Sequence, residues 1–316
     1  MKKNFKILFI DSTHKIFVEI LEKNGFHCDY FPEISANEIK KIICNYQGIV
    51  IRSRIKLDKL ILSKAKNLKF IARVGAGMEN IDLDFAKKNN IKCFNSPEGN
   101  RDAVGEHTLG MLLSLFNNLC RADKEVKNGI WKREENRGLE IKGKTIGIIG
   151  YGNMGTAFAQ RLQGFQTNII SYDKYKKDFG NSFVKEVSWN EIFEETDILS
   201  FHIPLNEETK FLFNKNLIKN FKKKIFVINT SRGKIINTND LIDGLKNNKI
   251  LGAALDVLEY EKTSFENLYK NKKNFSNFNF LKKSEKVILS PHIAGWTKES
   301  KIKLSKLLAE KICKFF

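Results

Sequence analysis

The stretch Ile146–Ala159 reads IGIIGYGNMGTAFA, and it decides the fold of the chain. Three of its glycines have the spacing Gly-x-Gly-x-x-Gly. The apolar residues Thr145–Ile149 predict a buried strand that ends at the first of these glycines, and Met154–Leu162 has the pattern of a helix. The glycines therefore lie in a tight turn between a strand and a helix, which is the context that a dinucleotide-binding motif requires.

Each glycine of this turn has a physical task. Gly150 permits the turn, Gly152 lets a pyrophosphate approach the backbone, and Gly155 lets the helix pack closely on the strand. The phosphates then meet free amides at the helix N-terminus. The next predicted strand, Asn168–Tyr172, leads into Asp173, 18 residues after Gly155. Its carboxylate would bind the adenosine ribose and repel a 2′-phosphate, which favours NAD over NADP. A plain strand–helix–strand unit with incidental glycines is the alternative.

Strands and helices alternate in two separate parts of the chain. Strands are predicted in the first part at Lys6–Ile10, His27–Tyr30, Gly48–Ile51, Phe70–Arg73 and Lys92–Phe94, and in the second at Thr145–Ile149, Asn168–Tyr172, Ile198–His202, Ile225–Asn229, Leu251–Val257 and Val287–Leu289. One long helix is predicted between the two parts, over Ala103–Lys127. Such alternation indicates parallel sheets covered by helices. We therefore expect an α/β protein with two doubly wound parallel-sheet domains.

Composition limits the classes of function. With 316 residues, 42% hydrophobic residues and only 4 prolines, the chain is expected to be globular and ordered. No apolar run is long enough to span a membrane, and the N-terminal apolar patch ends at Asp11, too early for a signal peptide. The 5 cysteines show no C-x-x-C spacing, which indicates reduced thiols in a cytoplasmic protein and no metal site. The net charge of +19 points to nucleic acid, but the lysines are spread evenly, so nucleic acid is not expected as a partner.

Five further segments carry a resemblance that covers nearly the whole chain. They are RVGAGMENID (Arg73–Asp82), GNRDAVGEHTLGMLL (Gly99–Leu113), FHIPLNEETKFLFN (Phe201–Asn214), FVINTSRGKIINTNDLIDGLKNNKILGAALDVLEYE (Phe226–Glu261) and VILSPHIAGWTKES (Val287–Ser300). Together they resemble the D-isomer-specific 2-hydroxyacid dehydrogenase family, and within it the 3-phosphoglycerate dehydrogenases most. The resemblance implies an NAD-dependent enzyme that oxidises a small 2-hydroxy acid to a 2-oxo acid.

The resemblance places the catalytic trio of the family on Arg232, Glu261 and His292. Removing a hydroxyl proton while a hydride leaves the same carbon needs a base that titrates near neutrality, which suits His292. Glu261 would orient the imidazole and stabilise its protonated form. Arg232 would hold the substrate carboxylate with a bidentate fork. Glu259 competes with Glu261, and the spacing from Arg232 favours Glu261. The other histidines are taken as structural, with a supporting role for His202 at the edge of the cofactor site.

The remaining positions of the two binding sites also come from the resemblance. For NAD they are Ala76, Gly150, Gly152, Asn153, Met154, Gly155, Asp173, His202, Ile203, Pro204, Thr230, Ser231, Asp256 and Gly295, with Asp256 near the nicotinamide amide. For the substrate they are Arg52, Ser53, Gly75, Ala76, Gly77, Asn100, Arg232 and His292, with Arg52 and Ser53 where phosphoglycerate dehydrogenases contact the phosphate. Lys132 and Arg133, after Trp131, would add positive charge across a subunit boundary.

The resemblance also implies a domain order. A flavodoxin-like substrate domain (1–99 and 290–316) receives an inserted Rossmann NAD domain (100–289), and the predicted long helix mediates a homodimer. The chain ends soon after the last motif, so no C-terminal regulatory domain is expected. Two features depart from the family: Lys262 stands where a proline is usual, and Tyr269–Lys283 reads as an irregular excursion.

Several functions remain open at this stage. The reaction that the resemblance favours is oxidation of 3-phospho-D-glycerate to 3-phosphohydroxypyruvate, a step of serine biosynthesis. A hydroxypyruvate/glyoxylate reductase or a D-lactate type enzyme is the alternative within the family. An NAD-binding corepressor would explain the net charge of +19. A decayed enzyme that is retained only for binding would explain the unusual amino-acid composition. Neither explains a complete set of arginine, glutamate and histidine.

Overall fold

The computed structural model describes residues 5–261 and 275–316, and these divide into two compact units. The first unit holds the chain up to Arg101 and the segment Trp296–Phe316, and the second begins at Asp102 and ends at Gly295. The sequence placed the later boundary at residue 290. The difference arises because the backbone amides of Ile293 and Ala294 bond to a side chain of the second unit, described below.

The first unit is built on a parallel five-stranded sheet with the order β2-β1-β3-β4-β5. This is the flavodoxin-like order that the resemblance implies. Its strands are β1 (Lys6–Phe9), β2 (His27–Tyr30), β3 (Gly48–Ile51), β4 (Phe70–Arg73) and β5 (Lys92–Asn95). Its helices are α1 (Ile16–Lys23), α2 (Ala36–Ile42), α3 (Lys59–Leu62), α4 (Leu83–Lys88) and α12 (Lys298–Phe315), with short 3-10 turns at Ile43–Asn45 and Pro97–Gly99.

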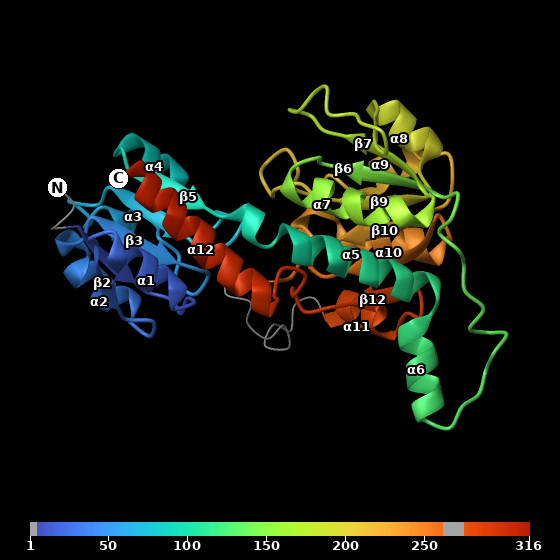
Figure 1. Ribbon diagram of the computed structural model, residues 1–316. Coiled ribbons are helices and arrows are strands. Elements are labelled where there is room, and N and C mark those ends of the chain that lie inside the picture. Colours follow the sequence, from blue (N-terminus) through green and yellow to red (C-terminus); the bar gives the residue numbers. More distant parts are fainter. Residues whose placement is uncertain (1–4, 262–274) are drawn as a thin grey trace. The chain divides into compact units, whose positions relative to one another are not determined.

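Both faces of this sheet are covered. Successive residues of β1 point to opposite faces, so Ile7 packs against α1 and α12, while Leu8 packs against the side of α2, α3 and α4. The C-terminal helix α12 returns to lie along α1, where Leu308 and Ile312 are fully buried (Figure 1). Although it is the last element of the chain, α12 therefore completes the core of the first unit.

The second unit is built on a parallel seven-stranded sheet with the order β12-β11-β10-β9-β6-β7-β8. Its strands are β6 (Thr145–Ile149), β7 (Asn168–Tyr172), β8 (Lys185–Glu186), β9 (Ile198–Phe201), β10 (Ile225–Asn229), β11 (Ile250–Leu255) and β12 (Val287–Leu289). Its helices are α5 (Arg101–Phe116), α6 (Leu119–Lys127), α7 (Asn153–Leu162), α8 (Trp189–Glu195), α9 (Lys215–Asn220), α10 (Thr238–Lys246) and α11 (Phe275–Lys283). Strand order reverses at β6, the first strand of the unit, as in a Rossmann domain. The predicted fold class is confirmed.

The core of this second sheet also has two sides. Helices α5 and α7 cover one face, where Leu112 and Phe158 pack against Ile146 and Ile148 of β6. Helices α8, α9 and α10 cover the other face, and their side chains form the second cluster around β9 and β10. All strands run parallel, so the loops that follow their carboxyl ends gather at one edge, where ligands bind in such sheets.

The predicted long helix Ala103–Lys127 is wrong in one respect, because it is two helices. Helix α5 ends at Phe116 and α6 begins at Leu119. Between them Asn118 adopts a left-handed conformation with φ = 53°, which asparagine tolerates better than most residues. The break turns α6 away from the sheet of the second unit (Figure 1).

The segment Tyr269–Lys283, predicted to be irregular, is helical over its described part. Helix α11 occupies Phe275–Lys283, and its Leu281 is 1% exposed within the core of the second unit. Residues 269–274 lie outside the described residues.

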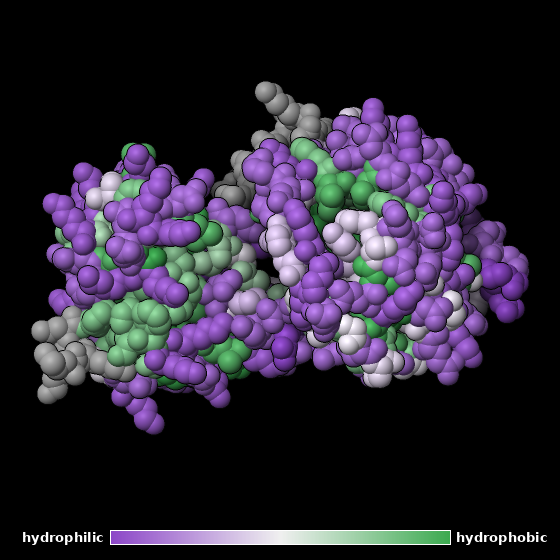
Figure 2. Space-filling model, turned by 90° about the horizontal axis from the view of Figure 1, so that it is seen from above, coloured by the Kyte–Doolittle hydropathy of each residue, from purple (hydrophilic) through white to green (hydrophobic). Residues whose placement is uncertain are grey.

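Hydrophilic residues cover most of the surface seen in Figure 2, with smaller hydrophobic areas on both units. In the two described ranges, no helix is both long and apolar enough to cross a bilayer.

Candidate active site

The glycine-rich turn between β6 and α7 leaves no room for two side chains. Gly150 has φ = +92°, and a Cβ on it would lie 2.6 Å from the carbonyl oxygen of His202. A Cβ on Gly155 would lie 2.0 Å from the carbonyl oxygen of Gly150. Both positions therefore need glycine for backbone reasons alone.

Gly152 differs from its neighbours because the space around it is open. It is the N-cap of α7, and a Cβ on it would meet no described heavy atom within 4 Å. Asn153 and Met154 are the first residues of the helix, so their amides have no partner within it. An open, amide-lined helix N-terminus fits a pyrophosphate.

Asp173 follows β7 and lies beside the same turn. Its carboxylate accepts hydrogen bonds from the backbone amides of Tyr151, Tyr175 and Lys176 at 2.8–2.9 Å. Burial raises the pKa of Asp173, but these amides and the Lys176 ammonium outweigh it and hold the pKa below its usual range. Asp173 thus fixes the glycine turn and carries a negative charge beside it.

The loop after β9 begins with His202, Ile203 and Pro204, which the sequence assigned to the cofactor site. The His202 imidazole is 9% exposed; its Nε2 lies 2.8 Å from Ser200 Oγ, and its ring packs on Phe158. Burial lowers the pKa of His202 to about 3, so the ring stays neutral. The His202 carbonyl and the Ile203 side chain lie against Gly150, so they restrict the space at the glycine turn.

The loop after β10 carries Thr230, Ser231 and Arg232. The Asn229 side chain ties this loop together: its oxygen accepts from the amide and hydroxyl of Ser231, and its nitrogen donates to the Arg232 carbonyl. The Arg232 guanidinium is partly exposed and donates to the Ser231 carbonyl at 2.6 Å. Hydrogen bonds from Asn229 therefore hold the backbone that carries the Arg232 guanidinium.

Gly233 brings the arginine loop against the loop that carries the candidate glutamate. A Cβ on Gly233 would lie 1.9 Å from the carbonyl oxygen of Leu258 and 2.5 Å from the amide nitrogen of Glu259. Only a glycine allows the two backbones to approach this closely. The 3-10 turn Gly233–Ile235 then leads away into α10.

The candidate base is in contact with a carboxylate. His292 Nδ1 lies 2.6 Å from Glu261 Oε2, and the two side chains are 24% and 19% exposed. The other oxygen of Glu261 accepts from the amide of Leu258. Glu259, the competing acid, instead accepts from the amide of Thr238 at the start of α10. The structure therefore pairs His292 with Glu261 and gives Glu259 a capping contact.

Asp256, at the end of β11, holds the turn on which His292 stands. Its carboxylate is fully buried and accepts from Ser290 Oγ at 2.6 Å and from the amides of Ile293 and Ala294 at 2.9 Å. Burial raises the pKa of Asp256, but these hydrogen bonds and one from a nearby histidine outweigh it and hold the pKa low. The sequence placed Asp256 near the nicotinamide amide, and this stays a prediction; its described contacts hold the turn that carries His292.

Sequence reasoning overlooked two residues of this network, His107 and Thr108 on α5. His107 Nε2 lies 3.0 Å from Ser290 Oγ and 3.5 Å from Asp256 Oδ1. The Thr108 hydroxyl lies 3.0 Å from that of Thr230. The sequence analysis took His107 as structural and gave Thr108 no role, because no spacing rule links them to the later motifs.

The predicted substrate residues of the first unit lie after three adjacent strands. Arg52 and Ser53 follow β3, the residues Gly75, Ala76 and Gly77 follow β4, and Asn100 follows β5 and its 3-10 turn. The loops are tied together, since Asn80 donates to the Arg52 carbonyl and Asn95 to that of Ala76.

Two of these side chains have polar groups suited to an anion or hydroxyl. The Arg52 guanidinium donates to the Ser12 carbonyl and lies 4.6 Å over the ring of Trp296, which leaves its fork held in place. The buried side-chain oxygen of Asn100 has no hydrogen-bond partner among the described residues.

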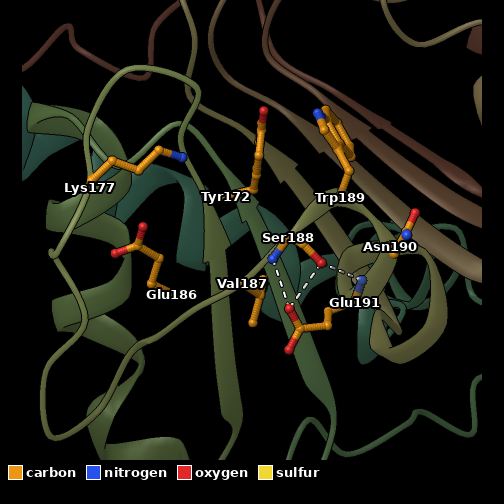
Figure 3. A pocket seen from close by; sticks show the side chains of 8 residues that line it. All are labelled: Tyr172, Lys177, Glu186, Val187, Ser188, Trp189, Asn190 and Glu191. Atoms are coloured by element: carbon orange, nitrogen blue, oxygen red, sulfur yellow. Dashed lines mark hydrogen bonds between the residues drawn. The ribbon is translucent and has the colours of Figure 1, made fainter.

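A shallow pocket at the β7–β8 edge is separate from these groups. Figure 3 shows its lining, in which Tyr172 and Trp189 lie beside Ser188 and Glu191. The last two form the capping box of α8, with the Ser188 amide and hydroxyl donating to Glu191 and the Glu191 amide donating back. These polar groups are therefore used within the fold, and none of Arg232, Glu261 and His292 lines the pocket.

Comparison with known proteins agrees with this geometry. Residues 109–294 match the model of the D-isomer specific 2-hydroxyacid dehydrogenase family, NAD binding domain. The chain is 32% identical to a D-3-phosphoglycerate dehydrogenase of Archaeoglobus fulgidus over 309 residues, 97% of this chain and 56% of that protein. It is 34% identical to a hydroxypyruvate reductase of Thermotoga maritima over 281 residues, 89% of this chain and 88% of that protein. The chain thus spans about half of the first relative and most of the second.

A solved structure gives the same result. The D-lactate dehydrogenase of Aquifex aeolicus, complexed with NAD and lactic acid, has a TM-score of 0.83 at 28% identity and covers 98% of this chain and 95% of its own. The second unit is accordingly a domain for a nicotinamide cofactor, and the open helix N-terminus at Gly152 fits one. The chain belongs to the D-isomer specific 2-hydroxyacid dehydrogenase family.

Proposed function

We propose that the chain is a dehydrogenase that interconverts a D-2-hydroxy acid and the corresponding 2-oxo acid. The observation that carries the proposal is the 2.6 Å contact between His292 Nδ1 and Glu261, beside the loop of Arg232. With Nδ1 bonded to the carboxylate, Nε2 is the atom that takes the hydroxyl proton during oxidation and returns it during reduction. The nicotinamide, when bound, accepts or supplies the hydride.

Arg232 serves the same reaction by binding the substrate carboxylate. A guanidinium fork matches a carboxylate in plane and charge, so it fixes the position of C2 relative to the base. The backbone bracing by Asn229 keeps this fork in place. The side chain therefore orients the substrate, and the proton transfer is left to His292.

We propose NAD rather than NADP as the cofactor, on account of Asp173. The variant Asp173→Ala is expected to lower the ratio of NADPH to NADH dissociation constants about tenfold, because a carboxylate no longer repels the 2′-phosphate. Fluorescence titration with both cofactors measures this ratio without any substrate.

Asp173→Asn is the matched control for that experiment, since Asp173 also accepts the amide of Tyr151. Asparagine keeps an acceptor oxygen but loses the charge, so it should show a similar loss of discrimination with less loss of NADH affinity. An unchanged ratio in both variants would contradict the ribose role.

We propose 3-phosphoglycerate as the substrate. The support is the position of Arg52 and Ser53 at the carboxyl end of β3 and the similarity to D-3-phosphoglycerate dehydrogenases. A phosphate binds strongly to a guanidinium whose position is already fixed, because both groups are charged and two parallel hydrogen bonds form between them. The reaction would be a step of serine biosynthesis.

The substrate proposal is tested with a panel of 2-oxo acids and NADH. The purified protein is expected to reduce 3-phosphohydroxypyruvate with a kcat/KM at least about tenfold above that for hydroxypyruvate, glyoxylate or pyruvate, as one charge-assisted contact of about 1.4 kcal/mol predicts. Hydroxypyruvate is the second candidate, because of the similarity to the Thermotoga maritima reductase. Equal or reversed values would refute a phosphorylated substrate while leaving the reaction type intact.

We further propose a homodimer that uses α6 and the chain that follows it. This segment extends from the sheet of the second unit (Figure 1) and carries large exposed apolar side chains. They are Leu119, Val126, Ile130, Trp131 and Leu139. Lys132 and Arg133 are exposed beside Trp131, so in a dimer their positive charges would lie next to the partner subunit. Such a concentration of apolar surface is typical of an interface.

Trp131→Glu is expected to shift the protein from dimer to monomer in light scattering. Trp131 is 79% exposed, and losing a buried aromatic anchor typically weakens an interface by about 2 kcal/mol or more. Tyr175→Glu is the matched control, because Tyr175 is an aromatic residue that is 75% exposed elsewhere in the same unit. A wild-type mass that is already monomeric would refute the proposal.

A further inference from the structure

We propose that His107 is a positioning residue for the catalytic base, which it holds in place through Ser290 and Asp256. The inference rests on the proposed dehydrogenase reaction and adds to it a residue of α5, outside the predicted trio. His107 does not contact His292 in any described hydrogen bond; it acts on the turn from which His292 projects.

The hydrogen-bond directions in this network follow from the geometry. Ser290 Oγ lies 2.6 Å from Asp256 Oδ1, and a carboxylate that already receives two amides can only accept, so the hydroxyl donates to it. The lone pairs of Ser290 Oγ then face His107 Nε2 at 3.0 Å. His107 must therefore carry a proton on Nε2, and this proton points to Ser290 or to Asp256, 3.5 Å away.

The far end of this chain of donors holds the backbone around His292. Asp256 Oδ1 accepts the amide of Ile293, Oδ2 accepts that of Ala294, and the Asp256 carbonyl accepts the amide of His292 at 2.7 Å. His292 itself has φ = 56°, a left-handed conformation that is rare for residues other than glycine. A strained residue persists only where its surroundings fix it, and here Asp256 supplies three of the fixing bonds.

The donor from His107 matters because Asp256 is fully buried. A buried carboxylate is costly unless each oxygen is hydrogen-bonded, and the hydrogen bonds of His107 and Ser290 lower the pKa of Asp256 against the effect of burial. Without the imidazole N–H, Ser290 Oγ loses the donor that helps to orient its hydroxyl toward Asp256, and Oδ1 keeps only the donors from Ser290 and Ile293. Asp256 then holds the turn that carries His292 less firmly.

The alternative is that His107 has only a packing role on α5. Its neighbour Thr108 argues against this, since its hydroxyl lies 3.0 Å from that of Thr230 in the loop that leads to Arg232. Two consecutive polar side chains of α5 therefore contact the two loops that carry His292 and Arg232. A space-filling residue would tolerate an apolar side chain of similar size, and a positioning residue would not.

The experiment compares His107→Leu, which removes the N–H, with His107→Gln, whose side-chain amide retains a donor. Both variants are assayed with NADH and the 2-oxo acid that the wild type reduces with the highest kcat/KM. His107→Leu should lower kcat about tenfold relative to the wild type, as the loss of one hydrogen bond to a charged group predicts. Its KM and its dissociation constant for NADH should change little. His107→Gln should recover most of this loss. His27→Leu, the same change at an exposed histidine of the first unit, is the matched control.

A second readout is independent of activity. Hydrogen–deuterium exchange of the peptide Val287–Gly295 should be faster in His107→Leu than in the wild type or His107→Gln, because the amides of residues 292–294 bond to Asp256. Ser290→Ala interrupts the same network with a smaller change and should give the same two effects, should His107→Leu fail to fold.

The two readouts separate the possible failures. Unchanged kcat and unchanged exchange in His107→Leu would overturn the inference, as would a loss of kcat that glutamine does not recover. Faster exchange without a change in kcat would show that the turn is held but that catalysis does not need it, which also overturns the inference. A wild-type protein inactive on every 2-oxo acid would refute the proposed function, and exchange alone would then decide whether His107 holds the turn.

Discussion

Replacing His292 by alanine is expected to lower kcat by about 10²- to 10⁴-fold, the usual contribution of a positioned acid–base group. No other described side chain bonds to Glu261 in a way that would substitute for the imidazole. NADH should still bind, because the glycine turn and Asp173 lie on β6 and β7 rather than on the turn after β12. Steady-state kinetics and a fluorescence titration of NADH measure the two effects separately.

Glu259 and Glu261, which lie two residues apart in the sequence, give this prediction an internal control. Glu261→Gln keeps the size of the side chain but removes the charge beside His292, so it should also lower kcat. Glu259→Gln makes the same change at the acid that accepts the Thr238 amide, and it should leave kcat within about twofold, because the glutamine side-chain oxygen can still accept this amide. Near-normal turnover in His292→Ala would reject His292 as the base.

Much of this architecture could be predicted because its signals are local. The strand predictions agree with the structure to within one or two residues, since short apolar runs between glycines and helical patterns mark buried parallel strands. The capping box of Ser188 and Glu191 is a local feature of the same kind, because its two partners lie three residues apart. The glycine turn also combines a spacing with a flanking pattern. The sequence therefore predicted every described strand of the two sheets except β8, and it predicted the glycine turn after β6.

The features that were missed depend on single residues or on distant partners. The helical pattern continues across Asn117 and Asn118, and only the left-handed backbone of Asn118 divides α5 from α6. Strand β8, Lys185–Glu186, is too short and too polar to show an alternating pattern. Strand pairing at a sheet edge, rather than side-chain hydrophobicity, defines it.

The role of Asp256 shows the same limit within the site. A resemblance can say that an aspartate belongs at this position, but not which donors it receives. Those donors come from Ser290, Ile293 and Ala294, which lie 34 to 38 residues later in the chain. Only the pairing of β11 with β12 brings them to the carboxylate. Contacts of this range need the fold before they can be assigned.

Gly233→Ala is expected to have a large effect on both stability and turnover, although it adds a single methyl group. Its Cβ would lie 1.9 Å from the Leu258 carbonyl oxygen and 2.0 Å from the carbonyl carbon. These are backbone atoms, so no side-chain rotation relieves the clash, and the two loops must separate. Overpacking of this kind costs about 1–3 kcal/mol of unfolding free energy, which a denaturant titration measures.

The same separation should reduce catalysis beyond the loss of stability, because it moves Arg232 away from the loop of Glu261. A shift of about 1 Å in a positioning group can cost about 10²-fold in rate. Gly110→Ala is the matched control: Gly110 lies within α5, where a Cβ would meet nothing within 4 Å of the described atoms, so alanine there should raise stability by about 0.5–1 kcal/mol and leave kcat unchanged. If Gly233→Ala retained wild-type kcat and stability, the close approach of the two loops would not be what aligns the arginine with the glutamate and histidine.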